Sequence, residues 1–422
     1  MNKSFWIETL GCPKNQVDSE KISGTLLLDG LTPAESPEEA NLIVVNTCSF
    51  VEEAREESIE TVFELSQLRN EDTELVVTGC LAERYGDDIA SSLGSDVDAV
   101  AGFGVPVTLG SKPEVPKFDL LNLPRPKREE PWGYVKIAEG CDRICGFCAI
   151  PSFRGPQRSR TIASITEEIV SLDVQEIVLV AQDLASYGKD QHESSENIID
   201  LVKEASTLVP WVRLLYLYPS SLTGELVDII ANSPVPYFDL SLQHVSAPLL
   251  RKMRRWGNGE RFSEIISRVR EIRPEASFRT NFIVGYPGET EKDHDLLLSF
   301  IEENEIDWCG LFPYSKEKGT YAATLGGEVA EGLKLERLRE LGELQDGISQ
   351  RKRDLLVNTE MTVLVESKGV ARSHREAPEI DGVVIVPDDL KIGSFENVFI
   401  REALGPDLIA DGSASRPRKH DG

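Results

Sequence analysis

The sequence predicts an α/β protein with three parts: an N-terminal parallel-sheet domain, a central partial (β/α)6 barrel and a small C-terminal all-β barrel. Over most of the chain, short strands rich in Val, Ile and Leu alternate with helical patterns, which is typical of parallel sheets. After a long polar helix, short strands separated by turn residues replace this alternation, the pattern of a closed β-barrel. We place the three domains at residues 1–105, 132–353 and 354–408.

The N-terminal domain alternates strand and helix from its first residues. Its expected strands are 4–10, 41–47 and 74–79, and its expected helices are 16–30 and 51–69. Residues 106–131 contain many prolines and a cluster of charges, which predicts a linker. The last residues, 409–422, are polar and predict a disordered tail.

The central domain repeats the alternation with longer units. Its expected strands are 134–140, 176–182, 212–218, 237–243, 277–285 and 308–314, and helical stretches include 164–173, 261–272, 292–304 and 332–356. About six βα units predict a partial barrel and not a complete eight-stranded one. The expected strands of the C-terminal barrel are 362–369, 382–387 and 397–405.

Composition limits the classes of function. The 422 residues include 72 acidic and 45 basic side chains, for a net charge of −27. Such a chain as a whole repels a phosphate backbone, and a basic protein partner fits it better. The main basic run, Arg251, Lys252, Arg254 and Arg255, could contact ribosomal RNA, but we expect it to be a solvated helix face. Neither a signal peptide nor a membrane span is expected, so we predict a cytoplasmic protein.

Three of the seven cysteines form a tight loop directly after the first expected barrel strand. Cys141, Cys145 and Cys148 can occupy three corners of a cubane iron–sulfur cluster and leave the fourth iron open for a small molecule. Barrels of this kind place their chemistry past the C-terminal ends of the strands. The alternative is a zinc site, but structural zinc needs four ligands and no fourth Cys or His lies nearby.

Three further cysteines each follow an expected strand of the N-terminal domain. Cys12, Cys48 and Cys80 are spaced by about one βα unit, and the C-terminal ends of parallel strands share one edge of a sheet. These thiolates are therefore expected to converge and to hold a second cluster. The alternative is three unrelated buried cysteines, since free cysteine is often buried. Cys309 lies within an expected strand and is expected to serve packing alone.

Polar residues and glycines end several barrel strands and are candidates for binding a cofactor. Gln182 ends the second strand, and Ser241 and Gln243 end the fourth. Gly285 and Glu289 lie in the turn YPGET, where glycine lets backbone approach a ligand closely. Each polar side chain could instead be a hydrogen-bonded structural group, and Thr290 could cap the helix that follows.

The segment KIAEGCDRICGFCAIPSFRG, residues 136–155, resembles the cluster loop of the radical S-adenosylmethionine superfamily, and specifically of its methylthiotransferases. The resemblance implies two [4Fe-4S] clusters, with S-adenosylmethionine chelated by the open iron of the barrel cluster and cleaved to a 5′-deoxyadenosyl radical. It implies that the N-terminal cluster carries or delivers sulfur, and that the segment with Gly285 and Glu289 lines the cofactor pocket. Gln182, Ser241 and Gln243 are candidates for the same pocket from their place at strand ends, and the sequence leaves open which of them contacts cofactor and which contacts substrate. The resemblance also implies an electron donor such as flavodoxin or ferredoxin, and a C-terminal barrel like a TRAM domain.

Two subfamilies compete, one acting on adenosine in tRNA and the other on the β-carbon of an aspartate in ribosomal protein S12. LGCPKNQVDSE, SLQHVS and FPYSKEKGT are similar to the protein-modifying pattern. Residues 354–404 carry ten acidic and five basic side chains, a difference of −5, which disfavours tRNA. A reading from another class is a non-catalytic iron–sulfur or ribosome-binding protein, although electron carriers usually close their clusters with four ligands.

Overall fold

The computed structural model describes residues 3–191 and 196–412, except for 104, 106, 108 and 110–118. Parts of the predicted linker (106, 108, 110–118) and of the predicted tail (413–422) therefore lie outside the described residues. Within the described part of the chain, no helix is long and apolar enough to cross a membrane.

The N-terminal domain is a parallel sheet with strand order β2-β1-β3-β4-β5. Its elements are β1 (Ser4–Thr9), α1 (Pro13–Leu28), β2 (Thr32–Pro33), β3 (Leu42–Thr47), α2 (Glu52–Leu68), β4 (Glu74–Gly79), α3 (Cys80–Leu93) and β5 (Ala99–Ala101). Apolar residues of α1 pack on one face, and those of α2 and α3 pack on the other. This cover explains why β3 is buried along its whole length. Sequence does not predict β2 and β5, because two or three residues show no period.

Six parallel strands in chain order form the central barrel: β6 (Trp132–Lys136), β9 (Glu176–Val180), β10 (Trp211–Leu214), β11 (Tyr237–Gln243), β12 (Ser277–Val284) and β13 (Trp308–Pro313). They form two three-stranded sheets, joined by one parallel bridge between Leu217 and Leu240. Among the described residues β6 and β13 do not pair, so the barrel is open between its first and last strands. The predicted partial barrel is confirmed.

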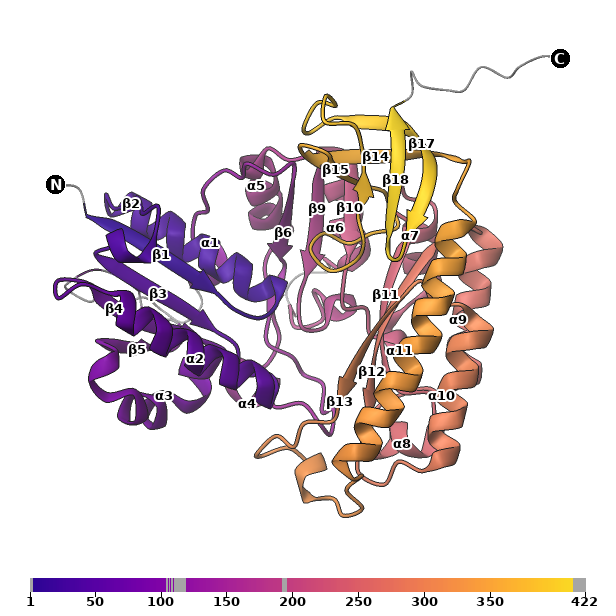
Figure 1. Ribbon diagram of the computed structural model, residues 1–422, viewed down its shortest axis with the longest axis horizontal. Coiled ribbons are helices and arrows are strands. Elements are labelled where there is room, and N and C mark those ends of the chain that lie inside the picture. Colours follow the sequence, from indigo (N-terminus) through magenta and orange to yellow (C-terminus); the bar gives the residue numbers. More distant parts are fainter. Residues whose placement is uncertain are drawn as a thin grey trace.

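Helices cover the outside of the barrel, where they bury the largest apolar core of the molecule (Figure 1). They are α5 (Ile162–Leu172), α6 (Ile198–Leu208), α7 (Gly224–Ala231), α8 (Ala247–Lys252), α9 (Gly259–Ile272) and α10 (Glu291–Asn304), followed by the long α11 (Glu331–Asp354) beside β13. The short elements β7 (Ala138–Glu139), α4 (Ile150–Arg154) and β8 (Arg158–Ser159) surround the cysteine loop. Thr290 caps α10 as predicted, in a capping box with Asp293.

The C-terminal domain is a closed barrel, β14-β15-β16-β18-β17, as predicted. Its strands are β14 (Glu360–Ser367), β15 (Val370–Arg372), β16 (Val384–Ile385), β17 (Phe395–Leu404) and β18 (Asp407–Gly412). The last strand continues to Gly412, beyond the expected limit at residue 408, because Leu408 and Ala410 point into the barrel core.

This small barrel closes the N-terminal end of the central barrel. Arg372 forms an ion pair with Glu176, the first residue of β9, at 2.7 Å. Asp381 accepts a hydrogen bond from the hydroxyl of Tyr237, the first residue of β11, at 2.5 Å. Both partners stand where their strands begin, so the C-terminal domain packs at the end opposite the cysteine loop. Figure 1 shows it at the top of the view, with α4 in the lower half.

The N-terminal domain packs against the barrel through α1. Lys21 on α1 is buried, pairs with Glu168 of α5 at 3.1 Å and donates a hydrogen bond to the carbonyl of Leu121. Arg125 pairs with the same Glu168 and with Glu20 of α1. The described end of the predicted linker is thus part of the domain interface.

We predict that acid weakens the folded chain through Glu376, whose carboxylate pairs with Arg353 of α11 at 2.5 Å. Burial alone would raise the pKa of Glu376, but Arg353 and hydrogen bonds from Ser373 outweigh it and lower the pKa from 4.5 to about 2. A carboxyl with a lowered pKa stabilises the folded state above its unfolded pKa. That contribution, about 3 kcal/mol, is lost as the pH falls from about 4.5 through about 2.

Urea unfolding at several pH values checks this expectation. Glu376→Gln should be less stable at pH 7 and should lose less stability than the wild type between pH 4.5 and 2. Glu225→Gln is the matched control, because Glu225 forms an exposed pair with Lys203. Equal pH dependence of Glu376→Gln and the wild type would contradict the assignment.

Candidate functional site

The three N-terminal cysteines lie at one edge of the sheet, as the sequence predicts. Cys12 precedes α1, Cys48 directly follows β3, and Cys80 is the first residue of α3 after β4. Their strands β1, β3 and β4 are neighbours in the sheet. Cys48 and Cys80 are buried, and Cys12 is partly exposed.

Two glycines bring these cysteines together. Gly11 has φ +94°, and a Cβ there would lie 2.8 Å from Cβ and 2.9 Å from Sγ of Cys48. Gly79 has φ +90°, and a Cβ there would lie 2.6 Å from the backbone of Thr47. Glycine alone combines this left-handed backbone with so close an approach.

The barrel cysteines lie in the loop between β7 and α4, past the end of the first strand. Cys141 is buried, and Cys145 and Cys148 are partly exposed. Arg255 donates a hydrogen bond from Nη1 to Sγ of Cys145 at 3.2 Å. Gly146 fixes the loop to the barrel, since its N–H donates to the carbonyl of Met253 at 2.8 Å.

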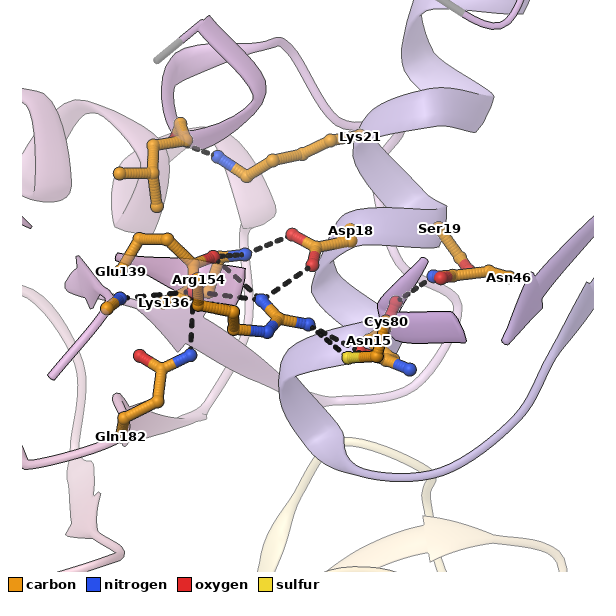
Figure 2. A network of polar contacts seen from close by, with 12 residues as sticks. Asn15, Asp18, Ser19, Lys21, Asn46, Cys80, Lys136, Glu139, Arg154 and Gln182 are labelled. Atoms are coloured by element: carbon orange, nitrogen blue, oxygen red, sulfur yellow. Dashed lines mark hydrogen bonds and ion pairs between the residues drawn. The ribbon is translucent and has the colours of Figure 1, made fainter. Parts of the chain in front are cut away.

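A buried polar network connects Cys80 with Glu139, just before the barrel cysteine loop (Figure 2). Arg154 of α4 donates to Sγ of Cys80 at 3.0 Å and to both carboxylate oxygens of Glu139 at 2.9 Å. Glu139 stands two residues before Cys141, and it also pairs with Lys136 at 2.8 Å. Lys136 in turn pairs with Asp18 of α1. One chain of contacts therefore runs from Cys80 to the start of the barrel cysteine loop.

The segment after β10 lies between the two groups. The ammonium of Lys14 stands 3.4 Å from the ring centre of Tyr216. The pKa of Tyr216 is raised, first by burial and second by the nearby Cys12. Two residues later, the ring of Tyr218 packs between Arg143 and Arg255, at 4.0 and 4.2 Å. Both groups of cysteines thus face the C-terminal end of the same barrel.

The thiols of each group influence one another. Burial, together with charge on Cys12 and Cys80, raises the pKa of Cys48 to about 12. Burial, together with charge on Cys145 and Cys141, raises the pKa of Cys148 to about 12. Metal ligation displaces such protons, because the ligand is the thiolate.

Cys12 differs from the other thiols. Burial alone would raise its pKa, but the positive charges of Lys14 and Arg154 and backbone hydrogen bonds outweigh burial, so the pKa lies below 9.0. The positive charges of Lys14 and Arg154 therefore favour the thiolate form of Cys12, which is the form that binds iron.

Among the described residues, no group of three or more His, Cys, Asp or Glu side chains is arranged around a single metal ion. A cubane differs from such a site, because each cysteine binds a different iron and the sulfurs stand apart. The donor set fits two clusters of this kind, since three thiols lie at one edge of the N-terminal sheet and three lie in one loop of the barrel.

The predicted cofactor residues fall into two sets. Gln182 donates to Glu139 at 2.7 Å, and its buried Oε1 has no protein partner, which leaves it available to a ligand. Ser241 and Gln243 lie at the end of β11, where the carbonyl of Ser241 accepts from Arg255 and Gln243 has φ 72°. These three lie at the cysteine end of the barrel.

Gly285 and Glu289 hold their own turn together. Glu289 accepts hydrogen bonds from the N–H groups of Gly285 at 2.6 Å and Tyr286 at 3.2 Å, and its other oxygen pairs with Arg337 of α11 at 2.9 Å. This carboxylate is buried and is occupied by protein groups. Its direct contact with a cofactor stays a prediction.

The expectation of a solvated basic face at residues 251–255 is wrong for Arg255, which is partly buried, whereas Arg251, Lys252 and Arg254 are exposed. Arg255 contacts Cys145, and Arg254 stacks on Tyr321 at 4.0 Å. Their α8 is short and ends at Lys252, so the run continues into a turn that bends towards the cysteine loop. The sequence also gave no role to Asp18, Lys136, Glu139, Arg143 and Tyr218. Glycine before Cys12, Cys80 and Cys141 was a usable signal for tight turns at the site.

Comparison with known proteins agrees with this geometry. Three family models match: "Uncharacterized protein family UPF0004" over residues 4–102, "Radical SAM superfamily" over 135–301 and "TRAM domain" over 357–412. The chain is 41% identical over 404 residues to "Ribosomal protein uS12 methylthiotransferase RimO" of Moorella thermoacetica, covering 90% of this chain and 92% of that protein. A protein of the same name from Aquifex aeolicus is 39% identical over 428 residues, with 95% of each chain covered.

The chain belongs to the RimO family of methylthiotransferases. It is a radical S-adenosylmethionine enzyme, a transferase that uses S-adenosylmethionine and [4Fe-4S] clusters. The predicted family is confirmed, and membership in RimO sets aside the non-catalytic alternative.

We predict that Gly11→Ala destabilises the chain more than Gly30→Ala does. Both glycines have positive φ, so both substitutions cost about 1–2 kcal/mol in backbone strain. A Cβ at Gly30 meets nothing within 4 Å, whereas one at Gly11 overlaps Cys48 and adds about 1–3 kcal/mol of overpacking. Thermal unfolding of the two variants measures the difference. Equal melting temperatures would show that Gly11 is not needed for the close approach to Cys48.

Proposed function

We propose that this chain inserts a methylthio group at the β-carbon of an aspartate in ribosomal protein S12. The observation that carries the proposal is the convergence of two groups of three cysteines at one end of the barrel, with Arg154 in contact with Cys80 and paired with Glu139 beside the other group. A reaction that activates one molecule and delivers sulfur from a second place needs two such centres side by side.

In this proposal Cys141, Cys145 and Cys148 hold one cluster, and Cys12, Cys48 and Cys80 hold the other. When bound, the first supplies the electron that cleaves S-adenosylmethionine to methionine and a 5′-deoxyadenosyl radical, and the second supplies sulfur. The chain's own residues bind and orient the cofactor and the substrate, and they exclude water from the site. Gln182 offers its free Oε1 to the cofactor, and the turn of Gly285 and Glu289 shapes the pocket wall.

The acidic charge of the chain and its sequence similarity to named relatives support the aspartate substrate. The relatives at 36–41% identity are named for ribosomal protein uS12. Ion pairs take Glu366, Glu376 and Asp381 out of the acidic surface of the C-terminal barrel, together with Arg372. Seven acidic and four basic side chains remain on residues 354–404. This domain lies at the end of the central barrel opposite the cysteines. Its negative charge therefore attracts a basic substrate through the electrostatic field of the whole molecule.

The substrate is tested with reconstituted enzyme, reductant and S-adenosylmethionine under anaerobic conditions. One reaction contains a peptide of the S12 loop, and a parallel one contains unmodified tRNA, with both products analysed by mass spectrometry. A methylthio group on the peptide aspartate supports the proposal. Modification of tRNA adenosine would leave the family intact and overturn the substrate.

We predict that Cys145→Ala abolishes formation of 5′-deoxyadenosine, because the barrel cluster loses a ligand. Cys48→Ala should retain this cleavage and lose methylthio transfer. Cys309→Ala is the matched control, since Cys309 lies within β13 and should leave both products unchanged. Continued deoxyadenosine production by Cys145→Ala, or normal transfer by Cys48→Ala, would contradict the assigned roles.

A further inference from the structure

The loop between β13 and α11 contacts both halves of the site. Figure 1 shows it at the lower edge of the view, where it leaves β13. Its Glu317 is a charged residue that is only 2% exposed. A buried carboxylate is costly unless it is paired, so its partners indicate what the loop holds.

The partners of Glu317 are arginines of the N-terminal domain. Oε2 accepts from Arg55 of α2 at 2.7 Å and from Arg84 of α3 at 2.8 Å. Oε1 accepts from the hydroxyl of Ser315 at 2.7 Å, and that hydroxyl also accepts from the N–H of Glu52 at 3.3 Å. The loop is thereby hydrogen-bonded to the N-terminal turns of α2 and α3.

The contacts of the loop reach the segments of two N-terminal cysteines, Cys80 and Cys48. Arg84 is on α3, which begins at Cys80, and it also donates to the carbonyl of Ser49, next to Cys48, at 3.0 Å. Arg84 further donates to the carbonyl of Lys318 at 3.3 Å. One guanidinium thus links the loop to the segments of two cysteines.

The other end of the loop holds the barrel cysteines. The N–H of Ala322 donates to the carbonyl of Gly146, between Cys145 and Cys148, at 2.7 Å. A Cβ at Gly146 would lie 3.1 Å from the ring of Tyr321, so the loop packs directly on the cysteine loop.

We propose that Glu317 is a positioning residue that fixes the two groups of cysteines relative to one another, through Arg55 and Arg84 on one side and its own loop on the other. This inference rests on the proposed function of the two groups. Cleavage of S-adenosylmethionine needs the barrel group of cysteines alone, whereas sulfur transfer needs both groups at the correct distance and orientation relative to one another. A misplacement of about 1 Å can cost about 100-fold in rate, so loss of Glu317 should separate the two reactions.

The test is Glu317→Gln in the full chain with both clusters reconstituted. Formation of 5′-deoxyadenosine should stay within about twofold of the wild type, while methylthio product per deoxyadenosine falls about 100-fold. The magnetic interaction between the two reduced clusters, measured by electron paramagnetic resonance, should weaken. Unchanged product ratio and unchanged interaction would overturn the proposal, as would equal loss of cleavage and transfer.

Two further variants keep the test decisive. Glu328→Gln is the matched control, because Glu328 lies on the same loop and forms an exposed pair with Lys316. Arg55→Gln removes one partner only and should change the product ratio in the same direction by less. If Glu317→Gln does not fold, wild-type behaviour of Arg55→Gln overturns the proposal.

Hydrogen exchange of the chain without clusters separates this inference from the proposed function. Glu317→Gln should increase exchange both at the start of α3 and around Gly146, whatever the substrate. Unchanged exchange at these segments overturns the role of Glu317. A wild-type chain that yields no methylthio product on S12 would instead contradict the proposed function.

Discussion

The site depends on a network of buried charges between the N-terminal domain and the barrel. Lys136, Asp18, Glu139 and Arg154 have almost no exposed surface, and they pair with one another. Removing charges from water is expensive, and such a network is stable only while every member keeps its partners. Loss of one member leaves an unpaired charge in the interior. The arrangement therefore favours a single docking of the two domains, with Cys80 and Cys141 at its ends.

Both α/β domains use the same property of parallel sheets. Their strands end at one edge, and residues distant in sequence meet there. The N-terminal sheet brings Cys12, Cys48 and Cys80 together in this way, and the barrel presents its cysteine loop past the end of β6. The C-terminal barrel occupies the opposite end of the strands, where Arg372 and Asp381 close the interior.

Much of the fold could be predicted from the sequence, because burial on both faces gives parallel strands such as β3 and β9 a continuous apolar pattern. The cysteine groups could be predicted from their position after these strands. The edge strands β2 and β5 are too short for a pattern. The C-terminal barrel was recognisable, but its place at the N-terminal end of the central barrel depends on long-range pairs such as Arg372 with Glu176.

Polar side chains were harder to assign than cysteines. Arg255 belongs to a basic run that resembles a solvated face, and only the turn after α8 directs it to Cys145. Glu289 is in a segment that suggests ligand binding, yet its oxygens are used by Gly285, Tyr286 and Arg337. A charged side chain reveals its role only through its partners, which local sequence does not specify.

The central claim is that the two groups of cysteines hold two clusters at one shared end of the barrel. Anomalous diffraction at the iron edge, on crystals of the reconstituted full chain, tests it most directly. The account predicts two separate iron peaks, one at Cys12, Cys48 and Cys80 and one at Cys141, Cys145 and Cys148, with Arg154 between them. A single iron peak, or one with other ligands, would contradict it.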